Sequence, residues 1–291
     1  MTADSSGHVF LAVYVPEAHH RPSGRLNIYS GRGAKVVQSL NQAHVFFLPI
    51  LDSFGSLFTM CAAARVCEYA AAGNQKVLKQ RVIRRIALGK IPPLTHHVDG
   101  AHDFATDSSG DLAINRGGTV QVFAPGETAP YWSISPQTLD GMTATAFDSK
   151  GDLYLALRCV EPGYDGAVLE YAPGSSIYPI RNLSTLDGVV CPDSVKVDTF
   201  DNLYVLGGYT HPNVTVFPPT GDTLLRTMTE GIVEAQGHVI ALDSLGDVYV
   251  SNSGVFGSDP GSVVVYPAGG STPIRTVTKG MQNPQELATG P

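Results

Sequence analysis

The sequence has few charged residues and no long hydrophobic segment. Charged side chains make up 15% of the 291 residues, and the formal net charge is −7. A nucleic-acid interface needs clustered Lys and Arg to neutralise phosphates, so this acidic balance argues against a nucleic-acid partner. The longest apolar candidate, 45–51, contains Pro49 and is much shorter than the roughly 18–20 residues of a membrane-spanning helix. The sequence therefore predicts neither a nucleic-acid partner nor a membrane span.

Cysteine is also scarce, and none of the four cysteines belongs to a Cys-x-x-Cys pair. This argues against a disulfide scaffold and against a paired-cysteine metal site. Cys61 and Cys67 are placed to bridge a hairpin, and Cys159 and Cys191 are placed to bridge neighbouring elements; four free, partly buried thiols fit equally well. No signal segment precedes the first repeat, so we expect a trimmed mature domain; a secreted or periplasmic location is preferred, and the compartment stays open.

Apolar residues, glycine and proline are abundant instead. Hydrophobic side chains make up 43% of the chain, which is enough for a full core and argues against a disordered segment. The 31 glycines and 20 prolines, together with 12 tyrosines and 11 phenylalanines, suit many short strands joined by tight turns.

An Asp-x-x-Gly turn followed by an alternating apolar strand recurs along the whole chain. The six copies begin at Asp4, Asp52, Asp107, Asp148, Asp198 and Asp243. The copy at Asp198 has Asp201 where the others have Gly, and Asp also tolerates the left-handed conformation. A period of about 45–50 residues is typical of the blades of a β-propeller.

Each copy holds four expected strands. The second strand ends in an aromatic residue and is expected at 25–29, 65–69, 119–123, 167–171, 213–217 and 262–266. A third strand follows, for example at 273–277, and a short apolar strand such as 238–242 leads into the next turn. The chain begins without this last strand type and ends with it at 283–289, so pairing the termini would close a ring. We therefore predict that residues 1–291 form one all-β domain, a six-bladed β-propeller of four-stranded blades, rather than a β-solenoid with shorter coils.

One residue from each blade is expected at the mouth of the central channel, where the innermost strands begin. Counting back five residues from each repeat Asp gives most of this ring, and Gln285 is added by matching 284–285 to 192–193. His44 joins the ring if a bulge near Pro49 accommodates three extra residues. The six ring residues are His44, His102, Thr143, Asp193, His238 and Gln285.

Three imidazoles and a carboxylate around one axis are the composition of a transition-metal site. We expect His44, His102 and His238 to bind one divalent transition metal, with zinc preferred over iron, nickel or copper, and to leave an open position for chemistry. The predicted catalytic residues are Asp193, as base or additional ligand, with Arg158 and Tyr209, which follow strands near the axis. The residues expected to orient the ligands or to contact the substrate are Asp103, Thr143, Gln285 and Glu286. A single histidine is more often a surface residue than a ligand; three at one repeat position carry the hypothesis.

The blade phrase Cys-Pro-Asp-Ser-Val-Lys-Val-Asp at 191–198, followed by Asn-Leu-Tyr-Val at 202–205, resembles the NHL-repeat family of six-bladed propellers. The resemblance extends over essentially the whole chain and implies the fold, while the functions in this family include enzymes, sensors and adhesion modules. The three histidines also resemble, in number and blade position, the zinc site of NHL-type peptidyl-amidoglycolate lyases. The gluconolactonase and paraoxonase relatives use Glu, Asn and Asp around calcium instead.

The leading functional hypothesis is a metal-dependent hydrolase. A metal-bound water in the central channel would attack a small-molecule ester, lactone or phosphoester. The first alternative is a non-catalytic NHL propeller that binds a peptide, glycan or protein partner on the same face. The second is a zinc-dependent lyase resembling peptidyl-amidoglycolate lyase. None of the three requires an oligomer.

Overall fold

The structure is a computed structural model that describes most of the chain from Asp103 onward and the strands before it. The described ranges are 9–15, 23–29, 36–42, 47–51, 56–61, 65–71, 78–87, 103–116, 118–135, 141–159, 166–208, 211–233, 239–252, 261–278 and 286–289. For 286–289 only the backbone is described. Before residue 103, side chains are described at 38, 50–51, 56–59, 65–70 and 85–86.

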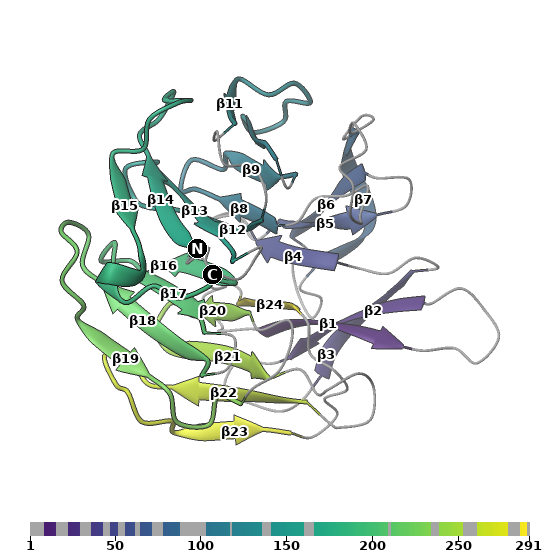
Figure 1. The fold of residues 1–291 in the computed structure, drawn as a ribbon. Coiled ribbons are helices and arrows are strands. Elements are labelled where there is room, and N and C mark those ends of the chain that lie inside the picture. The colour runs from purple at the N-terminus through teal and green to yellow at the C-terminus, as the bar shows by residue number, and fades with distance from the viewer. Residues whose placement is uncertain are drawn as a thin grey trace.

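The strands form a β-propeller of four-stranded antiparallel blades (Figure 1). Five sheets use four consecutive strands each. The first is β4 (Phe47–Leu51), β5 (Leu57–Cys61), β6 (Arg65–Ala71) and β7 (Leu78–Ala87). The second is β8 (Asp103–Thr106), β9 (Leu112–Asn115), β10 (Val120–Phe123) and β11 (Trp132–Ile134). The third is β12 (Met142–Phe147), β13 (Leu153–Leu157), β14 (Ala167–Tyr171) and β15 (Arg181–Leu183).

The remaining strands complete the described architecture. The fourth sheet is β16 (Ser194–Val197), β17 (Leu203–Gly207), β18 (Asn213–Phe217) and β19 (Arg226–Met228). The fifth is β20 (Ile240–Leu242), β21 (Val248–Asn252), β22 (Ser262–Tyr266) and β23 (Arg275–Val277). In another sheet, β24 (Glu286–Thr289) pairs with β1 (Val9–Val15), followed by β2 (Ser23–Tyr29) and β3 (Val36–Gln42). One short 3-10 helix, η1 (Thr185–Asp187), follows β15 and is capped by Ser184.

The first strands of successive sheets lie side by side around a common centre. β4 contacts β8, and contacts continue through β12 and β16 to β20; β24 contacts both β20 and β4 (Figure 1). The same kind of turn follows β8, β12, β16 and β20, so equivalent residues of these four blades face the same end of the ring. Within the described part of the chain, no helix is long and apolar enough to cross a membrane.

The repeat turns share one hydrogen-bond pattern. Oδ1 of Asp107 accepts from the backbone N–H groups of Ser109 and Asp111 at 2.9 and 2.8 Å. The carboxylates that begin the next three turns, at 148, 198 and 243, accept the same pair of bonds. The predicted left-handed residue is confirmed, because Asp201 has φ 61° where Gly151 of the preceding copy has φ 83°. These local bonds explain why the turns can be recognised in the sequence.

The hydrophobic core lies between neighbouring blades. One cluster joins the third and fourth sheets through Tyr154, Val195 and Phe217, all at most 1% exposed. Another joins the fourth and fifth sheets through side chains such as Val216 and Tyr266. Because each blade buries its two faces against two neighbours, the stability of one blade depends on the next.

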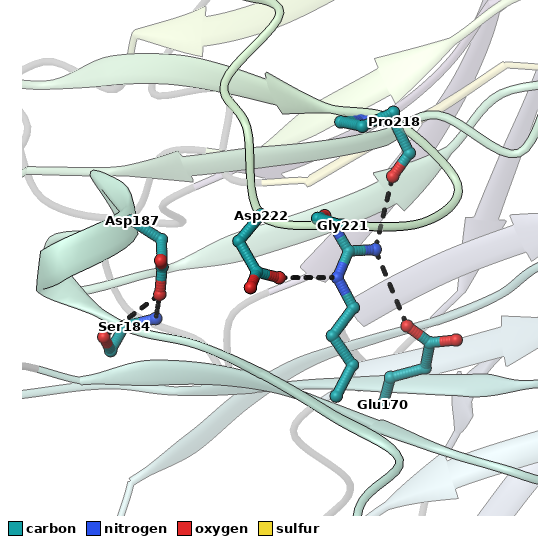
Figure 2. Close-up of polar contacts among 7 residues, drawn as sticks. Glu170, Ser184, Asp187, Pro218, Gly221 and Asp222 are labelled. Atoms are coloured by element: carbon teal, nitrogen blue, oxygen red, sulfur yellow. Dashed lines mark hydrogen bonds and ion pairs between the residues drawn. The ribbon is translucent and has the colours of Figure 1, made fainter.

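Polar side chains at the outermost strands also connect one blade to the next. Trp132 Nε1 on β11 donates to the carbonyl of Ser175 in the third sheet at 2.8 Å. Arg181 on β15 reaches the loop after β18, where Nη1 donates to Pro218 O at 3.2 Å and Nη2 donates to Gly221 O. Figure 2 shows this loop and Glu170 around the guanidinium. In both cases the acceptor is a backbone carbonyl four residues after the third strand of a blade, and the donor comes from the fourth strand of the preceding blade.

Most predicted strands agree with the structure, and small differences have local causes. The second strands at 167–171, 213–217 and 262–266 are confirmed as β14, β18 and β22. β10 begins at Val120 rather than at residue 119, because Thr119 O accepts from the Arg116 N–H in the preceding turn. The register of β4 against β5 shifts between Phe47 and Ile50, where the sequence predicts a bulge.

Candidate functional site

Three of the predicted site residues lie at the same end of two neighbouring blades. Thr143 is the second residue of β12, Arg158 directly follows β13, and Asp193 directly precedes β16. Because β12 and β13 are antiparallel, the end of β13 lies beside the start of β12. The innermost strands β12 and β16 are in contact, which brings all three residues to the start of the inner ring.

Arg158 and Asp193 form an ion pair across the boundary between the third and fourth sheets. Nε of Arg158 lies 3.2 Å from Oδ1 of Asp193, and the two side chains are 42% and 23% exposed. Thr143 Oγ1 donates to the carbonyl of Pro192, next to Asp193, at 3.0 Å. A pair this exposed contributes only about 0–1 kcal/mol to stability. The ion pair does, however, hold a guanidinium and a carboxylate together where solvent can reach both.

A disulfide fixes the two segments that carry this ion pair. Cys159 and Cys191 are bonded, with their Cα atoms 4.9 Å apart, so Arg158 and Asp193 lie one and two residues from the bridge. This settles one of the pairings left open by the sequence. Cys67 is also disulfide-bonded, and no described cysteine is a free thiol. The side chain of Cys61, its expected partner, lies outside the described side chains.

Tight backbone packing further restricts these segments. A Cβ atom on Gly207 would lie 2.3 Å from Val190 O, and one on Gly166 would lie 2.7 Å from Leu157 O. Both contacts are with backbone atoms, so a larger residue would force the chain apart. Only glycine fits at these two positions beside the disulfide.

We expect the disulfide to contribute about 3.7 kcal/mol to the free energy of unfolding, because it links residues 32 positions apart and so closes a loop in the unfolded chain. Replacing Cys159 and Cys191 by Ala should lower stability by about this amount in urea unfolding. The wild-type chain treated with a reductant should lose at least as much stability, because the bridge that holds Cys67 is reduced as well. An unchanged unfolding midpoint in the double variant would contradict a bridge in the folded protein.

Asp103 lies on the inner ring but is engaged by the neighbouring blade. Its Oδ2 accepts from the backbone N–H of Thr145 at 2.6 Å and from Thr145 Oγ1 at 3.2 Å. Burial raises the pKa of Asp103, while the charge of Lys196 and these hydrogen bonds act in the opposite direction. Asp103 therefore bonds β8 to β12 and faces the positive charge of β16, a position suited to supporting the inner ring.

The other predicted residues are placed by sequence alone. His44, His102, Tyr209, His238 and Gln285 lie outside the described residues. Glu286 is the first residue of β24 and is described by its backbone only.

The structure also reveals a group that the sequence reasoning did not select. Ligand oxygens of Asp148, Asp152 and Glu170 lie within 4.8 Å of one another in the third blade. The signal in the sequence is Glu170, which stands where the equivalent strands of the next two blades have Val216 and Val265. The two aspartates belong to the repeat turn, so a comparison between blades would have identified the additional carboxylate.

The fold and this site define the class of the protein as a β-propeller of four-stranded antiparallel blades with a polar, disulfide-tethered group where the innermost strands begin. No protein-family model matches the chain, and no curated protein is significantly similar to it. The functional argument therefore depends on the residues of the site.

Proposed function

We propose that the protein is a metal-dependent hydrolase of small-molecule esters, lactones or phosphoesters. The observation that carries the proposal is the Arg158–Asp193 pair, 3.2 Å apart at the end of the ring where the innermost strands begin. In the sequence, His102 directly precedes Asp103, the first residue of β8, and His238 lies two residues before β20. The proposal thus combines imidazoles, a guanidinium and a carboxylate at one end of the channel.

In this proposal His44, His102 and His238 hold one divalent transition metal, zinc in preference to others. Such a metal supplies an activated water and polarises the oxygen of the bond to be cleaved. Imidazole nitrogens are suitable ligands for zinc, and three of them leave a position for water. The positions of these three histidines around the channel are proposed from the sequence.

Arg158 and Asp193 have separate roles in the proposed reaction. The Arg158 guanidinium donates to the substrate oxygen on which negative charge develops, which is the charge-assisted contact that favours ester and phosphoester cleavage. Asp193 accepts the proton from the attacking water. Metal ligation by Asp193 would place a second cation beside the Arg158 guanidinium, 3.2 Å away, so Asp193 is assigned as the base and not as a fourth ligand. Tyr209 is assigned to catalysis with Arg158 and Asp193, and Gln285 and Glu286 are assigned to substrate contacts.

We also propose that the ring has six blades and is closed by the two termini, as in the NHL-repeat propellers that the sequence resembles. The support is the antiparallel pairing of β1 with β24, which places Val9 opposite Thr289 and Ala12 opposite Glu286. β24 also contacts the innermost strands on both sides, β20 and β4. This closure would place His44 and His102 on adjacent blades and His238 on the blade opposite that of His102, around one channel.

The hydrolase proposal predicts that His102→Ala and His238→Ala lose both bound metal and hydrolysis of a panel of ester, lactone and phosphoester substrates. Arg158→Ala should keep the metal and lower kcat/KM by about 100-fold, since one preorganised donor to the developing charge is lost. Lys150→Ala is the matched control, because this exposed cation lies in the turn at the other end of β12. Metal content and kinetics are measured on the same preparations.

Three results would reject the hydrolase. Metal-free protein with no turnover would favour the non-catalytic propeller that binds a partner on this face. Elimination products without water incorporation would favour the zinc-dependent lyase. Full hydrolysis in His102→Ala and His238→Ala would place the chemistry elsewhere.

A further inference from the structure

The third blade holds three buried carboxylates at the end opposite to Arg158 and Asp193. Asp148 and Asp152 flank the turn between β12 and β13, and Glu170 lies on β14. Their ligand oxygens all lie within 4.8 Å of one another, and the residues are only 6%, 8% and 6% exposed. Burying three such groups together is unfavourable unless positive charge compensates them.

The charges around this group leave it with an excess of negative charge. Arg181 Nη1 lies 3.6 Å from Glu170 Oε2, and Lys150 is the other cation that acts on the group. Asp201 of the next blade adds a fourth carboxylate to the surroundings of Asp152. Four carboxylates therefore face two cations, and burial raises the pKa of both Asp152 and Glu170.

Tyr154 provides an independent observation that points to a ligand. In the next two blades, the tyrosine six residues after the turn Asp donates to its Oδ2: Tyr204 to Asp198 at 3.2 Å and Tyr249 to Asp243 at 3.0 Å. Tyr154 occupies the same position and is 1% exposed, but among the described residues its hydroxyl has no hydrogen-bond partner. Burial, followed by the negative charge of Glu170, raises the pKa of Tyr154, so its hydroxyl lies beside Glu170 in this acidic group.

The group contains a second buried polar atom without a hydrogen-bond partner. Oε2 of Glu170 has no hydrogen-bond partner among the described residues, despite its ion pair with Arg181. Oδ1 of Asp148 is used by the backbone of Lys150 and Asp152, at 2.9 and 2.8 Å. A buried hydroxyl and a buried carboxylate oxygen are therefore available around one small volume.

We propose that Asp148, Asp152, Glu170 and the Tyr154 hydroxyl form a calcium site. Calcium takes several oxygen ligands at 2.3–2.6 Å in flexible geometry, so ligand atoms on opposite sides of one ion lie about 5 Å apart, in agreement with the observed grouping. Magnesium keeps most of its water and requires a stricter octahedron, which fits a buried, preformed set of protein oxygens less well. This site is separate from the proposed histidine site in ligands, metal and position.

Bound calcium would connect the turn after β12 to β14. It would satisfy both leftover oxygen atoms and neutralise the excess charge, so it would stabilise this blade against opening. At a calcium concentration 100-fold above the dissociation constant, the thermal midpoint should rise by about 5 °C.

The test uses the full-length chain freed of metals by chelation, and measures calcium binding by calorimetry and thermal unfolding with and without calcium chloride. Wild type should bind about one calcium per chain and shift its midpoint. Glu170→Val should bind calcium at least about 10-fold more weakly yet stay folded, because Val is the residue at this position in the next two blades. Glu170→Gln, which keeps the volume, should also weaken binding.

Two controls separate this proposal from the hydrolase. Asp247→Asn, the equivalent of Asp152 in the fifth sheet, should leave calcium binding unchanged because that blade has Val265 in place of a third carboxylate. His102→Ala should leave it unchanged as well. The proposal is overturned if wild type shows no calcium binding at millimolar concentration, or if Glu170→Val binds as tightly as wild type.

Discussion

Replacing Arg181 by Met is expected to lower the free energy of unfolding by about 3–5 kcal/mol in chelated buffer. The Arg181 side chain is 10% exposed and lies 3.6 Å from Oε2 of Glu170, which would become a buried carboxylate without its cation. The substitution also removes the donors to Pro218 O and Gly221 O that connect two blades (Figure 2). The ion pair with Asp222, at 3.5 Å, adds little because that carboxylate is 58% exposed. Urea unfolding measures the loss.

The double variant Arg181→Met/Glu170→Val is the matched control for this prediction. It removes the buried charge together with its partner, so most of the lost stability should return. What remains should be the inter-blade hydrogen bonds, about 1 kcal/mol each. The prediction is contradicted if the single variant loses less than about 1 kcal/mol, or if the double variant is no more stable than the single one. Either result would show that the buried Arg181–Glu170 pair contributes little to the free energy of unfolding.

Deleting residues 286–291 is expected to cause the largest loss, about 5 kcal/mol or more, because it removes the whole of β24. β1 would lose its backbone partner from Val9 to Ala12, and the gap between β20 and β4 would open. The thermal midpoint should fall by roughly 8 °C or more, and the exposed edge of β1 should promote association between chains. Calorimetry and light scattering measure the two effects.

The control for the deletion is removal of residues 290–291 alone, which follow the strand. This shorter deletion should leave the thermal midpoint and the light-scattering mass unchanged. If the longer deletion unfolded at the same temperature as the full chain, β24 would not close the ring, and the six-bladed architecture would have to be abandoned.

The sequence was sufficient for the blades because their signals are local. A turn Asp that binds the N–H groups two and four residues later, followed by alternating apolar residues, specifies a turn and a strand without reference to the rest of the chain. The strands at 213–217 and 262–266 were accordingly predicted to the residue. The left-handed Asp201 was predicted for the same reason.

Contacts between blades could not be predicted in this way. The partners of Arg181 lie about 40 residues away in a loop whose path depends on packing. Whether Cys159 and Cys191 are bridged or are free thiols depended on how close their two segments come. Counting from the turns did bring Arg158 and Asp193 to one end of the ring, because antiparallel strands fix which ends meet. Their pairing, and the unusual Tyr154 environment, required side-chain positions.

The metal content of the untagged, full-length chain is the most direct test of the proposed function. Plasma mass spectrometry before and after chelation should find about one equivalent of zinc or another divalent transition metal per chain. That metal should be lost in His238→Ala and retained in Glu170→Val, because Glu170 lies at the end of the third blade opposite to Arg158. A chain purified under mild conditions that holds no stoichiometric transition metal, or that keeps it in His238→Ala, would contradict the histidine site and with it the hydrolase.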